Sequence, residues 1–262
     1  VIQLLLANLQ FFKQSNLFSY RFLGETSLTN SINIARTQFK TGLTITPYGS
    51  TAHPNILAGF LMVYAIILLN KLELKKINHQ YFGWLLIFLV SWTIFLTQAY
   101  SAIIALTIYL TLKTFPQLKS KLSISLFLAL TVGGSILLVY LDKSFSDLSL
   151  KRRIFLNQQG LKIWLENFIL GTGLNSFLYS LKSNYSSEIV RFIQPVHHTL
   201  LLWLTETGLI GLGLLATIKA WLMKEKTLIL LFTFLPIITL DHYLLTQWVG
   251  GWLILVMVSL TE

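Results

Sequence analysis

The chain contains no cysteine and few charged residues. Only 11% of its 262 residues are charged, and there are 20 basic residues against 10 acidic ones. The absence of cysteine excludes disulfide bonds and thiolate metal sites. There is no cleavable signal pattern and no lipidation motif. Apolar residues dominate instead, since 54% of the chain is hydrophobic and its mean hydropathy is +0.68. These values are typical of an integral membrane protein.

Apolar runs recur along the whole sequence. We expect spans over about 1–12, 54–70, 82–97, 99–112, 122–141, 199–222, 228–241 and 246–260. Several are shorter than the ~20 residues of a perpendicular helical crossing. The sequence predicts one all-α membrane domain over 1–262, a polytopic bundle of about 7–8 transmembrane helices. Because the first residue is valine, we expect an N-terminally truncated piece whose earlier helices are missing.

Lysine in short loops predicts the orientation. The stretch 82–112 reads either as one long tilted helix or as two short helices broken at Thr97-Gln98-Ala99. Only a break puts the lysines of three short loops on one side of the membrane. These are Lys71, Lys75, Lys76, Lys113, Lys119, Lys121, Lys219, Lys224 and Lys226. The positive-inside rule makes that side cytoplasmic. It also explains the net charge of +10 better than nucleic-acid binding does.

The segment 142–198 then becomes a long external loop, because long loops are exempt from the rule. Within it, Leu161, Trp164, Leu165 and Phe168 repeat at i, i+3, i+4 and i+7. This repeat predicts an amphipathic helix that lies in the membrane interface.

Gly171-Thr172-Gly173-Leu174-Asn175 follows that helix and predicts a turn. Its backbone amides can come close to a ligand, although a plain turn is the commoner meaning of such a pattern. The same topology brings several scattered polar residues to the external face, which is where we expect a site. They are His53, Tyr100, Arg153, His197 and His242.

Four stretches resemble the O-antigen ligase and O-antigen polymerase family of bacterial membrane glycosyltransferases, over roughly 43–252. The most specific is a histidine and a polar residue, nine further residues, then Gly-x-x-Gly, with a glutamate shortly before the glycines. It is met by His197, His198, Gly208 and Gly211, with Glu206 as the glutamate. The others are Arg153 before Gly171-Thr172-Gly173, the stretch from Tyr48 to Asn55 around His53-Pro54, and Asp241-His242-Tyr243.

The sequence departs from the family pattern at four positions. His198 stands where asparagine, serine or glutamine is usual, and Phe168 stands where proline commonly precedes the glycine turn. Thr46 and Tyr100 occupy positions where relatives often carry arginine. If those arginines bind donor phosphate, this chain lacks part of that grip.

The resemblance implies transfer of a glycan from a polyprenyl-pyrophosphate carrier to a hydroxyl, at the external (periplasmic) face of the inner membrane. It implies an inverting, metal-independent enzyme of lipopolysaccharide or other surface-polysaccharide assembly that needs no cofactor. The acceptor would be a lipid A core sugar, a growing polysaccharide, or a serine or threonine of a protein. The partners are then the lipid-linked donor, the acceptor and membrane lipid.

The chemistry predicts roles for two residues. A sugar hydroxyl needs a base, and an imidazole with an ordinary pKa of ~6.5 serves at neutral pH. We assign this role to His197, since the positive end of the helix that follows disfavours its protonation. The leaving pyrophosphate needs cations, and no Asp-x-Asp pair is present to hold magnesium. Arg153 is therefore expected to bind the phosphates with its planar fork, with Arg152 and Arg191 in reserve.

Expected substrate contacts are His53, Gly171, Gly173, Asn175 and His242, and expected supporting residues are Glu206, Asp241 and His198. No metal ligands are expected.

Each assignment has a plainer competitor. His53 before Pro54 also reads as an ordinary helix start. Arg153 could bind lipid headgroups together with its basic neighbours. Glu206 is expected to be buried, and therefore paired or protonated. His198 is expected to face water or headgroups. Gly208, Gly211 and Gly213 are expected to let helices approach closely.

Two other functions stay open. One is a membrane transporter, although a transporter should carry ionisable residues deep in several spans. The other is an inactive family member, for which the absence of arginine at positions 46 and 100 is the motive.

Overall fold

The fold is known from a computed structural model. It describes residues 1–18, 24–28, 34–39, 42–73, 80–115, 117–118, 126, 129–130, 133, 148–182, 193–217 and 225–259. Arg191 lies outside these residues, and so does most of the span expected at 122–141. The chain divides into two compact units, Val1–Leu110 and Thr111–Glu262, and each is described by itself.

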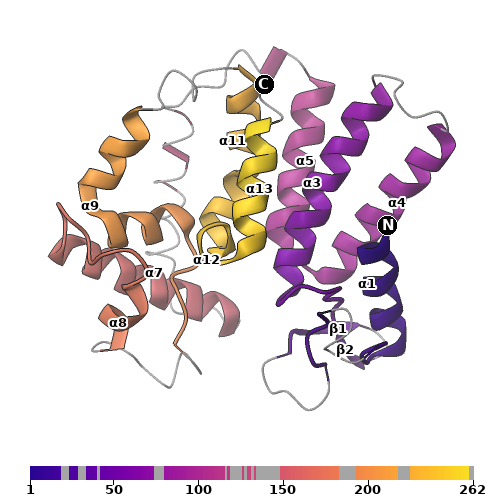
Figure 1. The fold of residues 1–262 in the computed structure, drawn as a ribbon, viewed down its shortest axis with the longest axis horizontal. Helices are drawn as coiled ribbons and strands as arrows, with labels where there is room; N and C mark the ends of the chain where they lie inside the picture. The colour runs from indigo at the N-terminus through magenta and orange to yellow at the C-terminus, as the bar shows by residue number, and fades with distance from the viewer. Residues whose placement is uncertain are drawn as a thin grey trace. The chain divides into compact units, whose positions relative to one another are not determined.

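The N-terminal unit is mainly helical (Figure 1). Its elements are α1 (Ile2–Lys13), β1 (Arg36–Phe39), β2 (Gly42–Ile45), α3 (Pro54–Glu73), α4 (Gln80–Thr97) and the first part of α5 (Tyr100–Thr114). The two strands pair antiparallel, with Arg36 opposite Ile45 and Phe39 opposite Gly42. This hairpin is an addition to the all-α architecture that the sequence predicts.

Hydrogen bonds between helices join the N-terminal unit. Asn8 Nδ2 donates to Thr93 Oγ1 at 2.7 Å, which links α1 to α4. Tyr109 Oη donates to Asn70 Oδ1 at 2.6 Å, which links α5 to α3. Such bonds are an established source of cohesion between helices in lipid, where the hydrophobic effect does not drive helices together.

The predicted break between the spans 82–97 and 99–112 is confirmed. α4 ends at Thr97, α5 begins at Tyr100, and Gln98 between them has φ 55°. α3 and α4 are the two described helices that are long and apolar enough to cross a membrane, while the apolar stretches of α5 and α9 are shorter. The larger number of spans stays a prediction.

A buried carboxylate holds the segment that leads to α3. Glu25 accepts hydrogen bonds from Gln10 Nε2 at 2.8 Å and from the amides of Leu17 and Phe18 at 3.1 and 2.8 Å. Burial raises the pKa of Glu25. These hydrogen bonds and the charge of Lys13 lower the pKa by more than burial raises it, so the net shift is downward. Gln10 also donates to the carbonyl of Gly49, which ties α1 to the chain just before His53.

The C-terminal unit carries α7 (Leu148–Glu166), α8 (Phe177–Leu181), α9 (Thr199–Thr217), α11 (Glu225–Leu240), α12 (Tyr243–Thr246) and α13 (Trp248–Ser259). α7 begins before the amphipathic repeat and ends at Glu166, so Phe168 lies in the turn after the helix. α9 is not the single straight span expected over 199–222. It turns sharply at Gly208, where φ is 60° and ψ is −155° (Figure 1).

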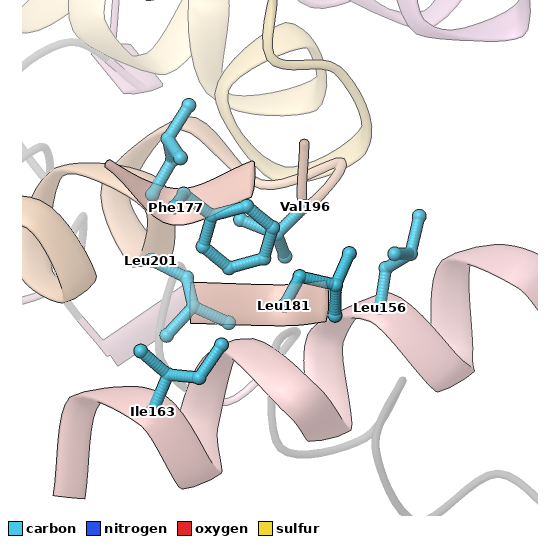
Figure 2. Packing of buried hydrophobic residues seen from close by; sticks show 7 residues of the cluster. Leu156, Ile163, Phe177, Leu181, Val196 and Leu201 are labelled. Carbon is cyan, nitrogen blue, oxygen red and sulfur yellow. The ribbon is translucent and has the colours of Figure 1, made fainter. Parts of the chain in front are cut away.

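One hydrophobic cluster joins α7, α8 and the entrance to α9. Figure 2 shows its side chains gathered beside α7. They are Leu156, Ile163, Phe177, Leu181, Val196, Leu201 and Leu202. Gly160 of α7 completes the fit, since a Cβ there would lie 3.2 to 3.4 Å from the side chains of Leu201 and Val196. The cluster therefore seats the chain immediately before His197 against α7.

Candidate active site

His198 caps the start of α9. Its Nδ1 accepts the amide N–H of Leu201 at 3.1 Å, and its carbonyl accepts that of Leu202 at 2.9 Å. The expectation that it faces water or headgroups is wrong, because only 1% of the residue is exposed. Asparagine and serine, two of the residues usual here in the resembled family, are among the commonest helix N-caps. A ring nitrogen performs the same task in this chain.

His197 is half-buried between two buried neighbours, Val196 and His198. Its Nε2 lies 3.4 Å from Gln194 Oε1. Its ring contacts that of His242, with the centroids 4.8 Å apart and the planes at 67°. Thr199 Oγ1 donates to the carbonyl of Asp241 at 2.8 Å, next to this ring contact. The structure thus brings together His197 and His242, which are distant in the sequence.

The junction between α11 and α12 supplies two further buried groups. Asp241 is 3% exposed and Tyr243 is also buried. Burial, and secondly the negative charge of Asp241, raise the pKa of the Tyr243 hydroxyl well above its usual value. The phenol therefore stays protonated beside the histidine pair.

Arg153 is half-buried on α7. Arg153, Asn157 and Gly160 follow one another at i, i+4 and i+7 and so share a helix face. Gly160 lies against Val196 and Leu201, on either side of His197 and His198 in the sequence. Arg153 is about 10 Å from Gly160 along the helix axis. Arg152 is also half-buried, whereas Lys151 is exposed.

Asn157 is a buried polar residue of α7 that was not among the predicted site residues. It is 1% exposed, and neither polar atom of its side chain has a hydrogen-bond partner among the described residues. The available signal in the sequence was a polar residue four positions after Arg153, and therefore on the same face of an amphipathic helix.

The glycine turn is joined to the break in α9. The amides of Thr172 and Gly173 donate to the carbonyls of Thr205 and Glu206, each at 2.9 Å. In return, the amides of Leu209 and Ile210 donate to the carbonyls of Phe168 and Ile169, at 3.0 and 3.3 Å. α9 thus uses the amides of Thr172 and Gly173, as in the plain turn that such a pattern more commonly means, and contact of Gly171 and Gly173 with substrate stays a prediction.

Two glycines make this contact possible. A Cβ on Gly171 would lie under 3.0 Å from the backbone of Glu206, and one on Gly208 under 3.0 Å from the backbone of Ile169. Gly208 also occupies a backbone region that essentially only glycine adopts. The missing side chain of Gly208 therefore makes room for the turn at 168–173, and not for a neighbouring helix. Gly213 has no described atom within 4 Å of its Cβ position, so the close approach of helices expected there stays a prediction.

Glu206 is half-buried, not buried as expected. Its Oε1 accepts the amide of Phe177, the first residue of α8, at 3.4 Å. Asn175, in the turn before α8, is exposed and has φ 61°. The described partner of Glu206 is thus a backbone amide, and its supporting role stays a prediction.

The other predicted residues lie in the N-terminal unit. His53 is exposed, and its Nδ1 accepts the amide of Asn55 at 3.2 Å, so it caps α3, which begins at Pro54. Thr46 is buried and donates to the carbonyl of Ala35 at 3.1 Å. Tyr100 is 67% exposed. Among the described residues, no three or more histidine, aspartate or glutamate side chains gather to hold a metal ion.

Comparison with known proteins supports the resemblance. A family model described as O-antigen ligase matches residues 85–216, which is half of the chain. The match contains Arg153, the glycine turn, His197 and the break at Gly208. No curated protein and no solved structure matches the chain. The protein belongs to the O-antigen ligase family, whose members are glycosyltransferase-like membrane enzymes of surface-polysaccharide assembly.

Proposed function

We propose that the protein transfers a glycan from a polyprenyl-pyrophosphate carrier to an acceptor hydroxyl, at the external face of the bacterial inner membrane. The observation that supports this most is the position of His197. His197 is a half-buried imidazole directly before α9. Its segment packs against Gly160 of α7, which shares a helix face with Arg153. A base and a fixed cation are what displacement of a pyrophosphate by a hydroxyl requires.

The reaction is a single displacement. The acceptor oxygen attacks the anomeric carbon, its proton passes to His197, and the bond between that carbon and the pyrophosphate oxygen breaks. The electron pair leaves with the pyrophosphate, so the configuration at the anomeric carbon is inverted. The ring nitrogen of His197 that takes the proton depends on the tautomer, and Gln194 Oε1, which can only accept a hydrogen bond, lies 3.4 Å from Nε2.

Arg153 stabilises the charge that gathers on the leaving pyrophosphate. A guanidinium offers a fork of donors that fits two phosphate oxygens, and it stays charged at every relevant pH. Arg152 is the reserve cation on α7, and Arg191 has the same role in this proposal. Side-chain cations make the transfer independent of a metal ion.

The remaining polar residues have lesser parts in the proposal. Asn175 in the turn and His53 at the start of α3 are offered as substrate contacts, while Gly171 and Gly173 act by holding the turn to α9. The acceptor is a lipid A core sugar, a polysaccharide or a protein hydroxyl. Ionisable groups gather at the start of α9 rather than along a span, which favours an enzyme over a transporter.

Transfer from a purified polyprenyl-pyrophosphate glycan, assayed with each class of acceptor in detergent, tests the proposal. We expect His197→Ala to lower kcat by about 10²-fold or more. Arg153→Ala should lower it by a similar factor, roughly 10²- to 10³-fold. Lys162→Ala, which removes an exposed cation from the same helix, is the matched control and should transfer like the wild type. A chelator should have no effect. If His197→Ala transferred glycan as fast as the wild type, His197 would not be the base.

A further inference from the structure

The junction between α11 and α12 lies against the start of α9 through two contacts. Thr199 Oγ1 donates to the carbonyl of Asp241, and the ring of His242 meets the ring of His197. The first contact ties the backbone of one segment to the first residue of the other. The second places an imidazole edge to face with the proposed base. His242 is thus held where its charge acts directly on His197.

Thr246 contacts the imidazole ring of His242. Thr246 Oγ1 lies 2.8 Å from His242 Nδ1 and donates to the carbonyl of His242 at 3.2 Å. The carbonyl of His242 also accepts the amides of Leu245 and Thr246, at 3.1 and 3.3 Å. The contact with Thr246 Oγ1 therefore holds the imidazole ring of His242 in one orientation beside His197.

Two imidazoles in contact do not both become charged easily. The first proton taken up by the pair disfavours the second, because two like charges would lie side by side. Other titratable groups on the adjoining segments are His198, Glu206, Arg152, Arg153, Asp241 and Tyr243, with Lys151, Lys162 and Glu166 exposed on α7 and with Glu225 and Lys226 at the far end of α11. The carboxylate of Asp241 favours the first proton on the pair, and the cations of α7 oppose the second. α13 carries no charged side chain.

We propose that His242, oriented by Thr246, is a positioning residue for His197: it packs against the ring of the base and keeps that ring uncharged. The inference rests on the proposed function, in which His197 is the base. A proton that reaches the pair is shared with His242, so His197 stays neutral to a lower pH than a lone histidine would. His242→Phe keeps a ring in the contact but removes its charge.

The pH profile of kcat/KM is the test. In His242→Phe the repulsion is gone, His197 takes a proton at higher pH, and the acid limb should move upward by roughly one pH unit. KM for the lipid-linked donor should stay within about twofold, since a positioning residue does not bind it. Thr246→Val should lower kcat several-fold. Thr239→Val is its matched control, because Thr239 Oγ1 donates only to carbonyls of its own helix, α11, in the described structure.

A second measurement does not need activity. In the full-length protein labelled with ¹⁵N-histidine, His197 and His242 should titrate in two separated steps, and in His242→Phe the remaining His197 should titrate once, at higher pH. An unmoved acid limb together with an unchanged His197 titration would overturn the inference. A raised donor KM with an unmoved limb would make His242 a substrate-binding residue instead. If His197→Ala transfers normally, the proposed function fails; if it is inactive while His242→Phe matches the wild type, only this inference fails.

Discussion

Two histidines, His53 and His198, have the same function at the starts of two helices. Each accepts a backbone N–H of the first turn through Nδ1, at 3.2 Å in α3 and 3.1 Å in α9. The first N–H groups of a helix lack partners within the helix, and a side-chain acceptor there supplies one. Only a neutral imidazole has this acceptor. The residue type that sequence reasoning associates with catalysis is here also a structural cap.

Replacement of His198 should show how much its hydrogen bond to the first turn of α9 contributes to stability. His198→Ala should lower the free energy of unfolding by about 1 kcal/mol, and His198→Asn should retain most of it, because asparagine is a good N-cap. Thermal unfolding of the detergent-purified protein measures both. The wild type should also lose its cap as the pH falls, whereas His198→Asn should not, since protonated Nδ1 cannot accept. Equal stability of the alanine variant and the wild type would show that the cap contributes nothing.

At the scale of elements, the break in α9 and the glycine turn depend on each other. In a continuous helix, the carbonyls of Thr205 and Glu206 would accept the amides of Leu209 and Ile210. The break at Gly208 separates these four groups, and the turn at 168–173 bonds to every one of them. In an apolar environment each unsatisfied group would cost several kcal/mol. The turn therefore completes the helix that carries the proposed base at its start.

Two glycines of α9 provide a matched test of the hydrogen bonding between the turn and the break in α9. Gly208→Ala should lower the free energy of unfolding by roughly 3 kcal/mol or more, because its φ is positive and its Cβ would enter the backbone of Ile169. Gly213→Ala should be neutral, or stabilising by up to about 1 kcal/mol, since alanine is the better helix former. Chemical or thermal unfolding in detergent compares them. Equal effects of the two changes would contradict the role given to the turn.

At the scale of the whole molecule, the orientation in the membrane is open to direct measurement. The chain has no cysteine, so a single introduced one reports on its own position. Lys71 and Lys182 are both exposed. The positive-inside rule puts Lys71 in the cytoplasm and Lys182 in the external loop. A membrane-impermeant maleimide should therefore label Lys182→Cys in intact spheroplasts, and Lys71→Cys only after permeabilisation. The opposite labelling pattern would put the proposed site on the cytoplasmic side of the membrane.

The sequence by itself determined the features that depend on local pattern. Apolar composition indicated a membrane protein, the break at Thr97-Gln98-Ala99 followed from where lysines must lie, and the spacing from His197 to Gly211 indicated the family. The start of α3 at Pro54 could also be read from the chain. These features involve residues near one another, so periodicity and spacing are enough to predict them.

Only the tertiary structure decided which distant groups meet. From the sequence, the amides of the glycine turn could serve a ligand or only form a plain turn, and the structure gives those of Thr172 and Gly173 to Thr205 and Glu206. His198 was expected in water, and the structure buries it as a cap. The contact of His197 with His242 was equally out of reach. A pattern shows which atoms need a partner, but the partner depends on how separate segments pack, and spacing along the chain does not contain that information.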